Sequence, residues 1–101
     1  MFGRRESRNE LDIPPIATAD KSAVEVLRVW AAPGKPQQLT LRTTWKEPAA
    51  WGLLLADVAR HAANAYAAEG LDRDDVLAHI LTMFRAEWEQ PTAEPEDITP
   101  G

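Results

Sequence analysis

The chain has 101 residues, of which 45% are hydrophobic, and it carries a formal net charge of −5. These values predict one globular domain with a modest core, and the negative charge counts against nucleic-acid binding as its main role. The absence of cysteine excludes disulfides, thiolate nucleophiles and cysteine-based metal sites.

The ends of the chain differ in composition from its middle. Residues 1–10 are polar and charged, which predicts a disordered arm, although the three arginines in it could instead contact an anion. Residues 91–101 predict a disordered acidic tail. A single α+β domain is expected over residues 11–90.

Neither end of the sequence suggests export or insertion into a membrane. The N-terminus lacks the apolar run of a signal peptide, and the longest apolar stretch, Leu53–Ala56, is too short to span a bilayer. We therefore expect a cytoplasmic protein that binds neither a membrane nor nucleic acid.

The segment from Leu11 to Ile16 contains a pair of prolines that enforce an extended path. Its leucine and two isoleucines give it apolar side chains to bury. We expect it to pack on the body of the domain and to end in a polar turn at residues 18–21.

Two runs rich in β-branched and aromatic residues come next. Ala23–Ala32 has two half-apolar faces, which is typical of a strand that is covered on both sides or central in a sheet. After a turn at Pro33–Pro36, Gln38–Trp45 alternates, with Leu39 and Leu41 on one side. The two runs are predicted to pair as an antiparallel hairpin whose leucine face lies on the helices.

A hairpin alone leaves the outer edge of its first strand unpaired, and an exposed edge invites pairing with another chain. Either Leu11–Ile13 lies along that edge, or two chains pair there and form a continuous four-stranded sheet. A homodimer is the favoured interpretation. It would form through this edge or through a stripe of small residues on the long helix.

That long helix is predicted over Pro48–Gly70, with a proline at its first position and a glycine at its end. One face is apolar and consists of Trp51, Leu54, Leu55, Val58, Ala62, Ala65 and Tyr66. Beside it runs the stripe of small residues, Gly52, Ala56, Ala59, Ala63 and Ala67. Small side chains let another backbone approach closely, so the stripe predicts a second packed surface, against either the other helix or a second copy.

A second helix is predicted from Asp72, a good N-cap, to the residue before Pro91. Its continuous apolar face consists of Val76, Leu77, Ile80, Leu81, Phe84 and Trp88. The connection between the helices is short, so they should be antiparallel neighbours. The predicted fold is therefore α+β: an antiparallel hairpin followed by two antiparallel helices packed on one face.

Three strings of this sequence, Ile13–Pro15, Glu25–Trp30 and Pro48–His61, resemble the domain-of-unknown-function 5076 family of small bacterial proteins. The similarity covers most of the chain, roughly Leu11 to Trp88. The family pattern has Asp at the position of Glu47, which affects only the start of the long helix. The resemblance implies one compact domain and no established activity, so no catalytic residue is carried over from it.

Few residues form a pattern with chemical meaning. Asp57 and His61 lie four apart on the long helix and could face one metal ion, but His79 lies on the other helix and no third ligand can be placed. A helix-surface pair is the favoured interpretation. The sequence predicts no catalytic residue, no cofactor and no metal.

The candidate partner or ligand surface consists of Arg28, Trp45, Trp51, Ala56 and Ala63. Arg28 could help to bind an anion or could pair with a nearby glutamate, Glu25. The two tryptophans flank the turn from hairpin to helix, where they could line a pocket or pack in the core.

The sequence favours a small interaction or regulatory protein without catalysis, working as a homodimer with a further protein partner that it does not identify. The alternative is a small-molecule-binding domain or an accessory enzyme subunit, with the two tryptophans and nearby arginines at a pocket.

Overall fold

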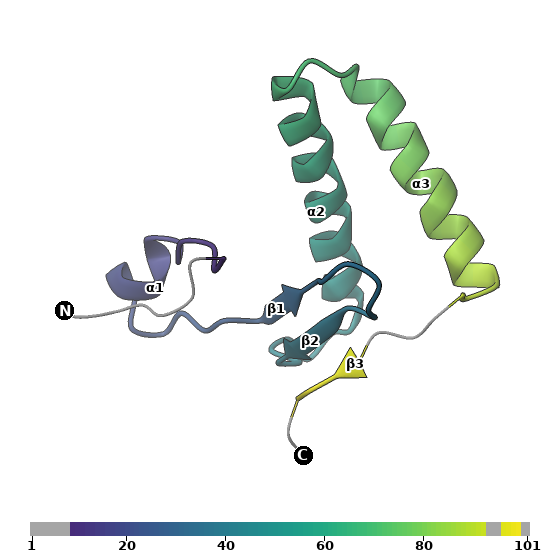
Figure 1. The fold of residues 1–101 in the computed structure, drawn as a ribbon. Coiled ribbons are helices and arrows are strands. Elements are labelled where there is room, and N and C mark those ends of the chain that lie inside the picture. The colour runs from purple at the N-terminus through teal and green to yellow at the C-terminus, as the bar shows by residue number, and fades with distance from the viewer. Residues whose placement is uncertain (1–8, 93–95, 100–101) are drawn as a thin grey trace.

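The structure is a computed structural model, and it describes residues 9–92 and 96–99. The elements in chain order are α1 (Ile16–Ala19), β1 (Leu27–Trp30), β2 (Gln38–Leu41), α2 (Ala49–Ala68), α3 (Arg73–Glu89) and β3 (Glu96–Asp97). Figure 1 shows a small sheet beside the first turns of α2, with α3 returning next to α2. The predicted α+β class, with a hairpin followed by two helices, is confirmed.

The two predicted strands pair antiparallel, but each is shorter than predicted. Leu27 lies opposite Leu41, and Val29 lies opposite Leu39. Directly opposed residues share a face, so these four side chains form the predicted leucine face. The regular pairing ends after Leu41, because Thr44 adopts a left-handed backbone conformation with φ of 64° that a strand does not contain.

A third strand joins this hairpin from the C-terminal part of the chain. β3 pairs parallel to β2, and the N–H of Ile98 donates to the carbonyl oxygen of Leu39 at 2.8 Å. The predicted disordered tail thus contains a short strand, Glu96–Asp97, that extends the sheet. Positions 93–95 and 100–101 of that tail, and positions 1–8 of the predicted N-terminal arm, lie outside the described residues.

The strand order in the sheet is β1-β2-β3, so β2 is central and β1 forms one edge. The half-apolar faces of this run predicted a central or covered strand. Within the single chain β1 has one neighbouring strand, and pairing of its free edge with a second copy stays a prediction.

The long helix α2 ends as predicted. The N–H of Gly70 donates to the carbonyl of Ala67 at 3.0 Å, and that of Leu71 donates to Tyr66 at 3.2 Å. Together with a φ of 106° at Gly70, these bonds form a Schellman motif, which glycine accommodates without a Cβ clash. The helix begins after Pro48, whose missing N–H is not needed there.

The second long helix also begins as predicted. The side chain of Asp72 accepts a hydrogen bond from the N–H of Asp75 at 2.9 Å, and Asp74 and Asp75 place negative charge in the first turn. Both arrangements stabilise a helix N-terminus. From the short connection, the two helices diverge toward the free end of α3 (Figure 1).

The segment before β1 does not pack on the body of the domain, and the sequence-based prediction that it would is wrong. Leu11 is 89% exposed, Ile13 66% and Ile16 61%. The helical turn α1 contacts no other described element, and the segment extends away from both long helices (Figure 1). We call residues 11–25 the projecting loop.

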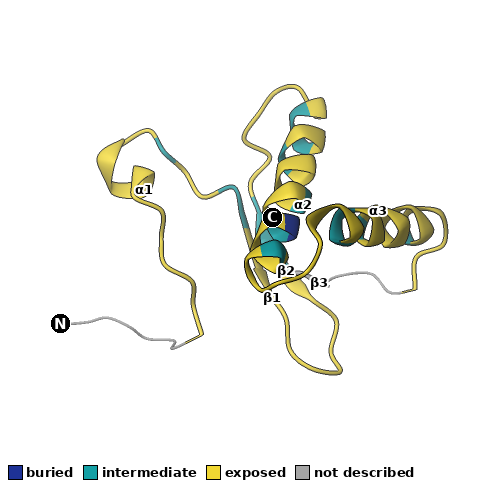
Figure 2. Cartoon of the chain, turned by 90° about the horizontal axis from the view of Figure 1, so that it is seen from above, coloured by how far each residue is buried: buried dark blue, intermediate teal, exposed yellow. Residues whose placement is uncertain are grey.

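Within the described residues, the chain buries almost nothing completely. Ala63 is the one residue in the buried class, at 0% exposure, and Figure 2 shows most of both long helices as exposed. The strands contact neither α2 nor α3 as elements. Single-chain packing therefore brings the helices together near their connection and leaves the rest of their apolar surface uncovered.

Candidate functional site

The turn from hairpin to helix brings two of the candidate residues together. The ring centroids of Trp45 and Trp51 lie 5.7 Å apart with an interplanar angle of 76°, an edge-to-face contact. The indole Nε1 of Trp51 donates to the carbonyl oxygen of Thr43 at 3.1 Å. Trp51 therefore uses the only hydrogen-bond donor of its side chain to attach the end of the hairpin to the first turn of α2.

The chain can make this contact because the backbone reverses sharply just before it. The N–H of Trp45 donates to the carbonyl of Thr43 at 2.6 Å, across the left-handed Thr44. The Thr44 hydroxyl donates to the carbonyl of Arg42 at 2.8 Å and so supports the same turn. These bonds give the two tryptophans a structural role at the joint between sheet and helix.

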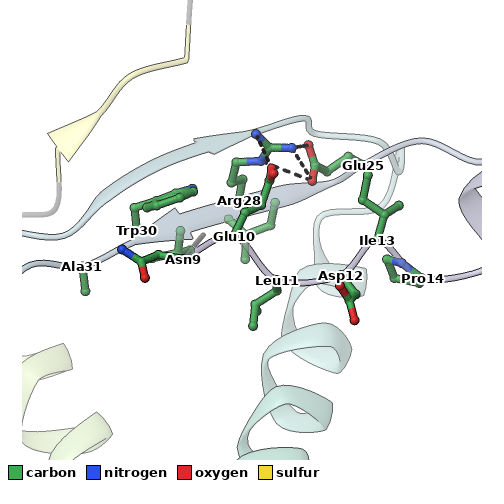
Figure 3. Close-up of a pocket in the computed structure, with 12 residues that line it drawn as sticks. Asn9, Glu10, Leu11, Asp12, Ile13, Pro14, Glu25, Arg28, Trp30 and Ala31 are labelled. Atoms are coloured by element: carbon green, nitrogen blue, oxygen red, sulfur yellow. Dashed lines mark hydrogen bonds and ion pairs between the residues drawn. The ribbon is translucent and has the colours of Figure 1, made fainter. Parts of the chain in front are cut away.

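Arg28, the third candidate residue, lies at the base of the projecting loop between two glutamates (Figure 3). Its guanidinium is 3.1 Å from a carboxylate oxygen of Glu25 and 3.6 Å from one of Glu10. The pairing with Glu25 was the simpler of the two sequence-based interpretations. Because two carboxylates surround this one cation, the geometry disfavours Arg28 as an anion-binding residue.

The same contacts give the projecting loop a closed base. Glu10 precedes the loop and Arg28 follows it, so their ion pair holds its two ends together. A groove of about 480 Å³ lies between the two ends, and residues 9–14 and 25–31 line it. Figure 3 shows the side chains of both segments around this groove, with the ion pairs drawn as dashed lines. Its lining is as polar as it is apolar.

A second hollow, of about 290 Å³, lies nearer the tip of the projecting loop and is mainly apolar. Its principal apolar lining residues are Ile13, Ile16, Ala17, Val24, Val26 and Leu27. The loop thus presents a concave apolar surface to its surroundings. Sequence reasoning missed it, because the isoleucines were predicted to pack on the body of the domain.

Hydrogen bonds within the loop maintain this shape. The N–H groups of Ala17 and Thr18 donate to the carbonyls of Pro14 and Pro15 at 3.0 and 3.1 Å. Asp20 accepts from both the N–H and the hydroxyl of Ser22, at 2.9 and 2.6 Å.

These two bonds from Ser22 hold the pKa of the Asp20 carboxyl below its ordinary value, and the bond from the hydroxyl has the larger effect.

The remaining candidate residues, Ala56 and Ala63, lie on the stripe of small residues of α2, and the structure separates them. Ala63 is fully buried, and α3 is the one described element in contact with α2. Ala56 is exposed, and a Cβ built on nearby Gly52 would meet no atom within 4 Å. The half of the stripe near the connection therefore packs against α3, whereas the other half is uncovered.

The titratable residues of the helices make ordinary surface contacts. Asp57 lies 3.7 Å from Arg60 on the same helix, and Nδ1 of His79 is 2.7 Å from the carbonyl oxygen of Asp75. Over residues 9–92 and 96–99, no three His, Asp or Glu side chains gather in a group that could hold a metal ion. The same residues include no helix with the length and apolar character needed to cross a bilayer.

Comparison with protein families gives a match over residues 10–92 to a domain of unknown function (DUF5076). The chain belongs to this family. The match begins at Glu10 and so includes the whole projecting loop, which is part of the family's domain rather than an addition to it. Comparison with curated proteins gave no significant match.

Among solved structures, the chain is similar to one from the photosynthetic bacterium Rhodopseudomonas palustrus CGA009, described as a "putative pyruvate dehydrogenase". The two sequences are 36% identical, the similarity covers 93% of each chain, and the TM-score is 0.69. The fold of this DUF5076 domain therefore recurs in that protein over nearly its whole length.

Proposed function

We propose that this DUF5076 protein is a small interaction or regulatory protein without catalysis, and that its working form is a homodimer. One observation carries the proposal: the single chain leaves its apolar faces uncovered. Large hydrophobic residues are exposed on every long element, and Ala63 alone among the described residues is in the buried class. An apolar surface of this extent on a soluble domain is typical of an interface.

The accessible surface supports the same proposal. The chain exposes 8847 Å², whereas a folded monomer of 11.2 kDa exposes about 5,700 Å². Obligate homodimers bury roughly 2,000–5,000 Å² in total, shared between the two copies. The surplus is of the size that such an interface would cover.

The non-catalytic part of the proposal rests on the side chains at the candidate site. Trp45 and Trp51 contact each other, and Arg28 is paired with two carboxylates. These contacts give each of the three side chains a structural role.

Sedimentation velocity over a range from low to high micromolar protein tests the dimer. We expect a species of about twice 11.2 kDa that persists on dilution through the lower micromolar range. A single species of 11.2 kDa up to several hundred micromolar, with the circular dichroism of a folded protein, would contradict the proposal.

A second candidate, an accessory enzyme subunit or small-molecule-binding domain, is favoured by the description of the solved relative. A thermal-shift screen with pyruvate and a panel of metabolites separates the two. A ligand present at a hundred times its dissociation constant would stabilise the protein by about 2.7 kcal/mol. We expect no such shift, and a reproducible one that Trp45→Ala abolishes would favour the second candidate.

A further inference from the structure

The projecting loop is shaped for contact with another molecule. The Glu10–Arg28 ion pair joins its two ends, the Asp20–Ser22 hydrogen bonds order its tip, and it extends away from both long helices (Figure 1). Preorganisation of this kind lowers the entropy that is lost on binding.

Its hollow of about 290 Å³ needs an apolar side chain to fill it. Isoleucine and valine side chains line most of it, and Glu25 is its one charged lining residue. The occupant that fits such a lining is a large hydrophobic group. The helical turn α1 contacts no other described element, so neither α2 nor α3 supplies that group within the described chain.

The most exposed large side chain of the long helices is a tryptophan, a large apolar group of the kind that such a hollow would take. Trp88 is 76% exposed near the end of α3, and its ring stacks on Phe84 with centroids 5.7 Å apart and an interplanar angle of 18°. The stacking restricts the rotamer of Trp88 and presents a flat aromatic surface. Tryptophan inserted into an apolar pocket is a frequent centre of binding energy at protein interfaces.

Each chain thus carries both parts, a hollow and a protruding aromatic residue, and covers neither. In a dimer with a twofold axis, the hollow of each copy can take the tryptophan of the other copy. Such a reciprocal exchange gives a closed dimer rather than an open filament. The surplus of accessible surface is large enough for the interface that a stable homodimer buries.

We propose that the projecting loop, residues 11–25, is the dimerisation element and that its hollow holds Trp88 from α3 of a second copy. The inference rests on the proposed homodimer and specifies its interface. It differs from the two interfaces that the sequence suggests, which are the β1 edge and the stripe of small residues on α2.

The first experiment measures the dimer dissociation constant of the full chain by sedimentation for two interface variants. Ile16→Glu places a charge in the hollow, and Trp88→Ala removes the inserted ring. Each should raise the dissociation constant at least tenfold. The control for Ile16→Glu is Lys21→Glu, on the exposed tip of the loop. The control for Trp88→Ala is Leu53→Ala on α2, where the leucine is 72% exposed. Both controls should leave the dissociation constant within about twofold of wild type.

The second experiment does not depend on destabilising substitutions, and it uses the absence of native cysteine. Ala17→Cys labels the rim of the hollow, and Arg85→Cys labels the surface of α3 beside Trp88. When the two single variants are mixed and oxidised, the expected product is a covalent dimer of one copy of each. Ala56→Cys replaces Arg85→Cys in the control mixture and should give far less mixed dimer.

The outcomes separate the two proposals. A dimeric wild type whose affinity is unchanged by Ile16→Glu and Trp88→Ala, with no Ala17–Arg85 cross-link, would overturn the loop exchange and leave the homodimer standing. An intramolecular disulfide in the Ala17→Cys/Arg85→Cys double variant would show that the loop folds onto its own chain, and would also overturn it. A wild type that is monomeric at every concentration would contradict the homodimer itself and assign the hollow to a different protein.

Discussion

Trp51 meets Trp45 edge-on, with ring centroids 5.7 Å apart, at the point where the hairpin passes into the long helix. This contact and the Trp51–Thr43 hydrogen bond of 3.1 Å connect the end of the hairpin to the first turn of α2. The orientation of the sheet on the helix therefore depends in part on these two aromatic residues.

A double-mutant cycle with Trp45→Ala and Trp51→Ala should measure that dependence. We expect each substitution to lower the free energy of unfolding, with a coupling energy of about 0.5–1.5 kcal/mol, the usual range for an aromatic pair. Chemical denaturation of the four proteins gives the values. Trp51→Phe keeps an aromatic ring but loses the N–H, and should cost about 1 kcal/mol. Strict additivity of the two alanine variants would show that the contact does not stabilise the protein.

The two alanines of the small-residue stripe should respond differently to enlargement. Ala63→Leu places extra atoms in the fully buried contact of α2 with α3, and should destabilise the protein by about 1–3 kcal/mol. Ala56→Leu is the matched control on an exposed turn of the same helix, and should change stability by at most about 0.5 kcal/mol. Thermal and denaturant unfolding measure both.

The oligomeric state of Ala56→Leu tests whether the small-residue stripe is the dimer interface. If the uncovered half of the stripe were the dimer interface, a leucine there would weaken the dimer even though the fold survives. An unchanged dissociation constant agrees with dimerisation through the projecting loop, and a large increase would favour the stripe instead.

Local signals predicted the helices well, because the residues that start and stop them act on their own backbone. Asp72 caps α3 through a bond to Asp75, three residues away, and Gly70 ends α2 through its own positive φ. The leucine face of the hairpin was equally local, since alternation alone places Leu39 and Leu41 on one side.

The predictions that failed concern contacts between distant segments. The apolar side chains of Leu11 and Ile13 indicated burial but not where it would occur, and the single chain leaves both exposed. Strand β3 depends on a pairing with β2 across the whole helical part of the chain, which its two acidic residues do not signal. Arg28 could be linked to Glu25 nearby, whereas Glu10 belonged to a segment predicted to be disordered.

Acid should loosen the tip of the projecting loop. Because the folded state lowers the pKa of Asp20, its hydrogen bonds from Ser22 stabilise the loop fully above the unfolded value of about 3.9. That stabilisation is lost as the pH falls through the lower, folded pKa. An NMR titration of the Asp20 carboxyl should give a midpoint below the ordinary value of about 3.9 for an aspartate.

Ser22→Ala is the matching test of the cause. Without the hydroxyl, the larger of the two contributions disappears, so the Asp20 midpoint should move up toward the ordinary value. Coincident Asp20 midpoints in the wild type and the variant would show that the serine hydroxyl does not hold the carboxylate.

Replacing Gly70, the glycine that ends α2, with a residue that has a side chain should destabilise the protein. Gly70 has a φ of 106°, so Gly70→Ala should destabilise the protein by about 1–2 kcal/mol through backbone strain, although no atom lies within 4 Å of the added Cβ. Gly52→Ala is the control: it lies inside the same helix with equally open space, and alanine there should stabilise by about 0.5–1 kcal/mol. Unfolding curves that shift in the same direction for both variants would contradict the assignment of strain to Gly70.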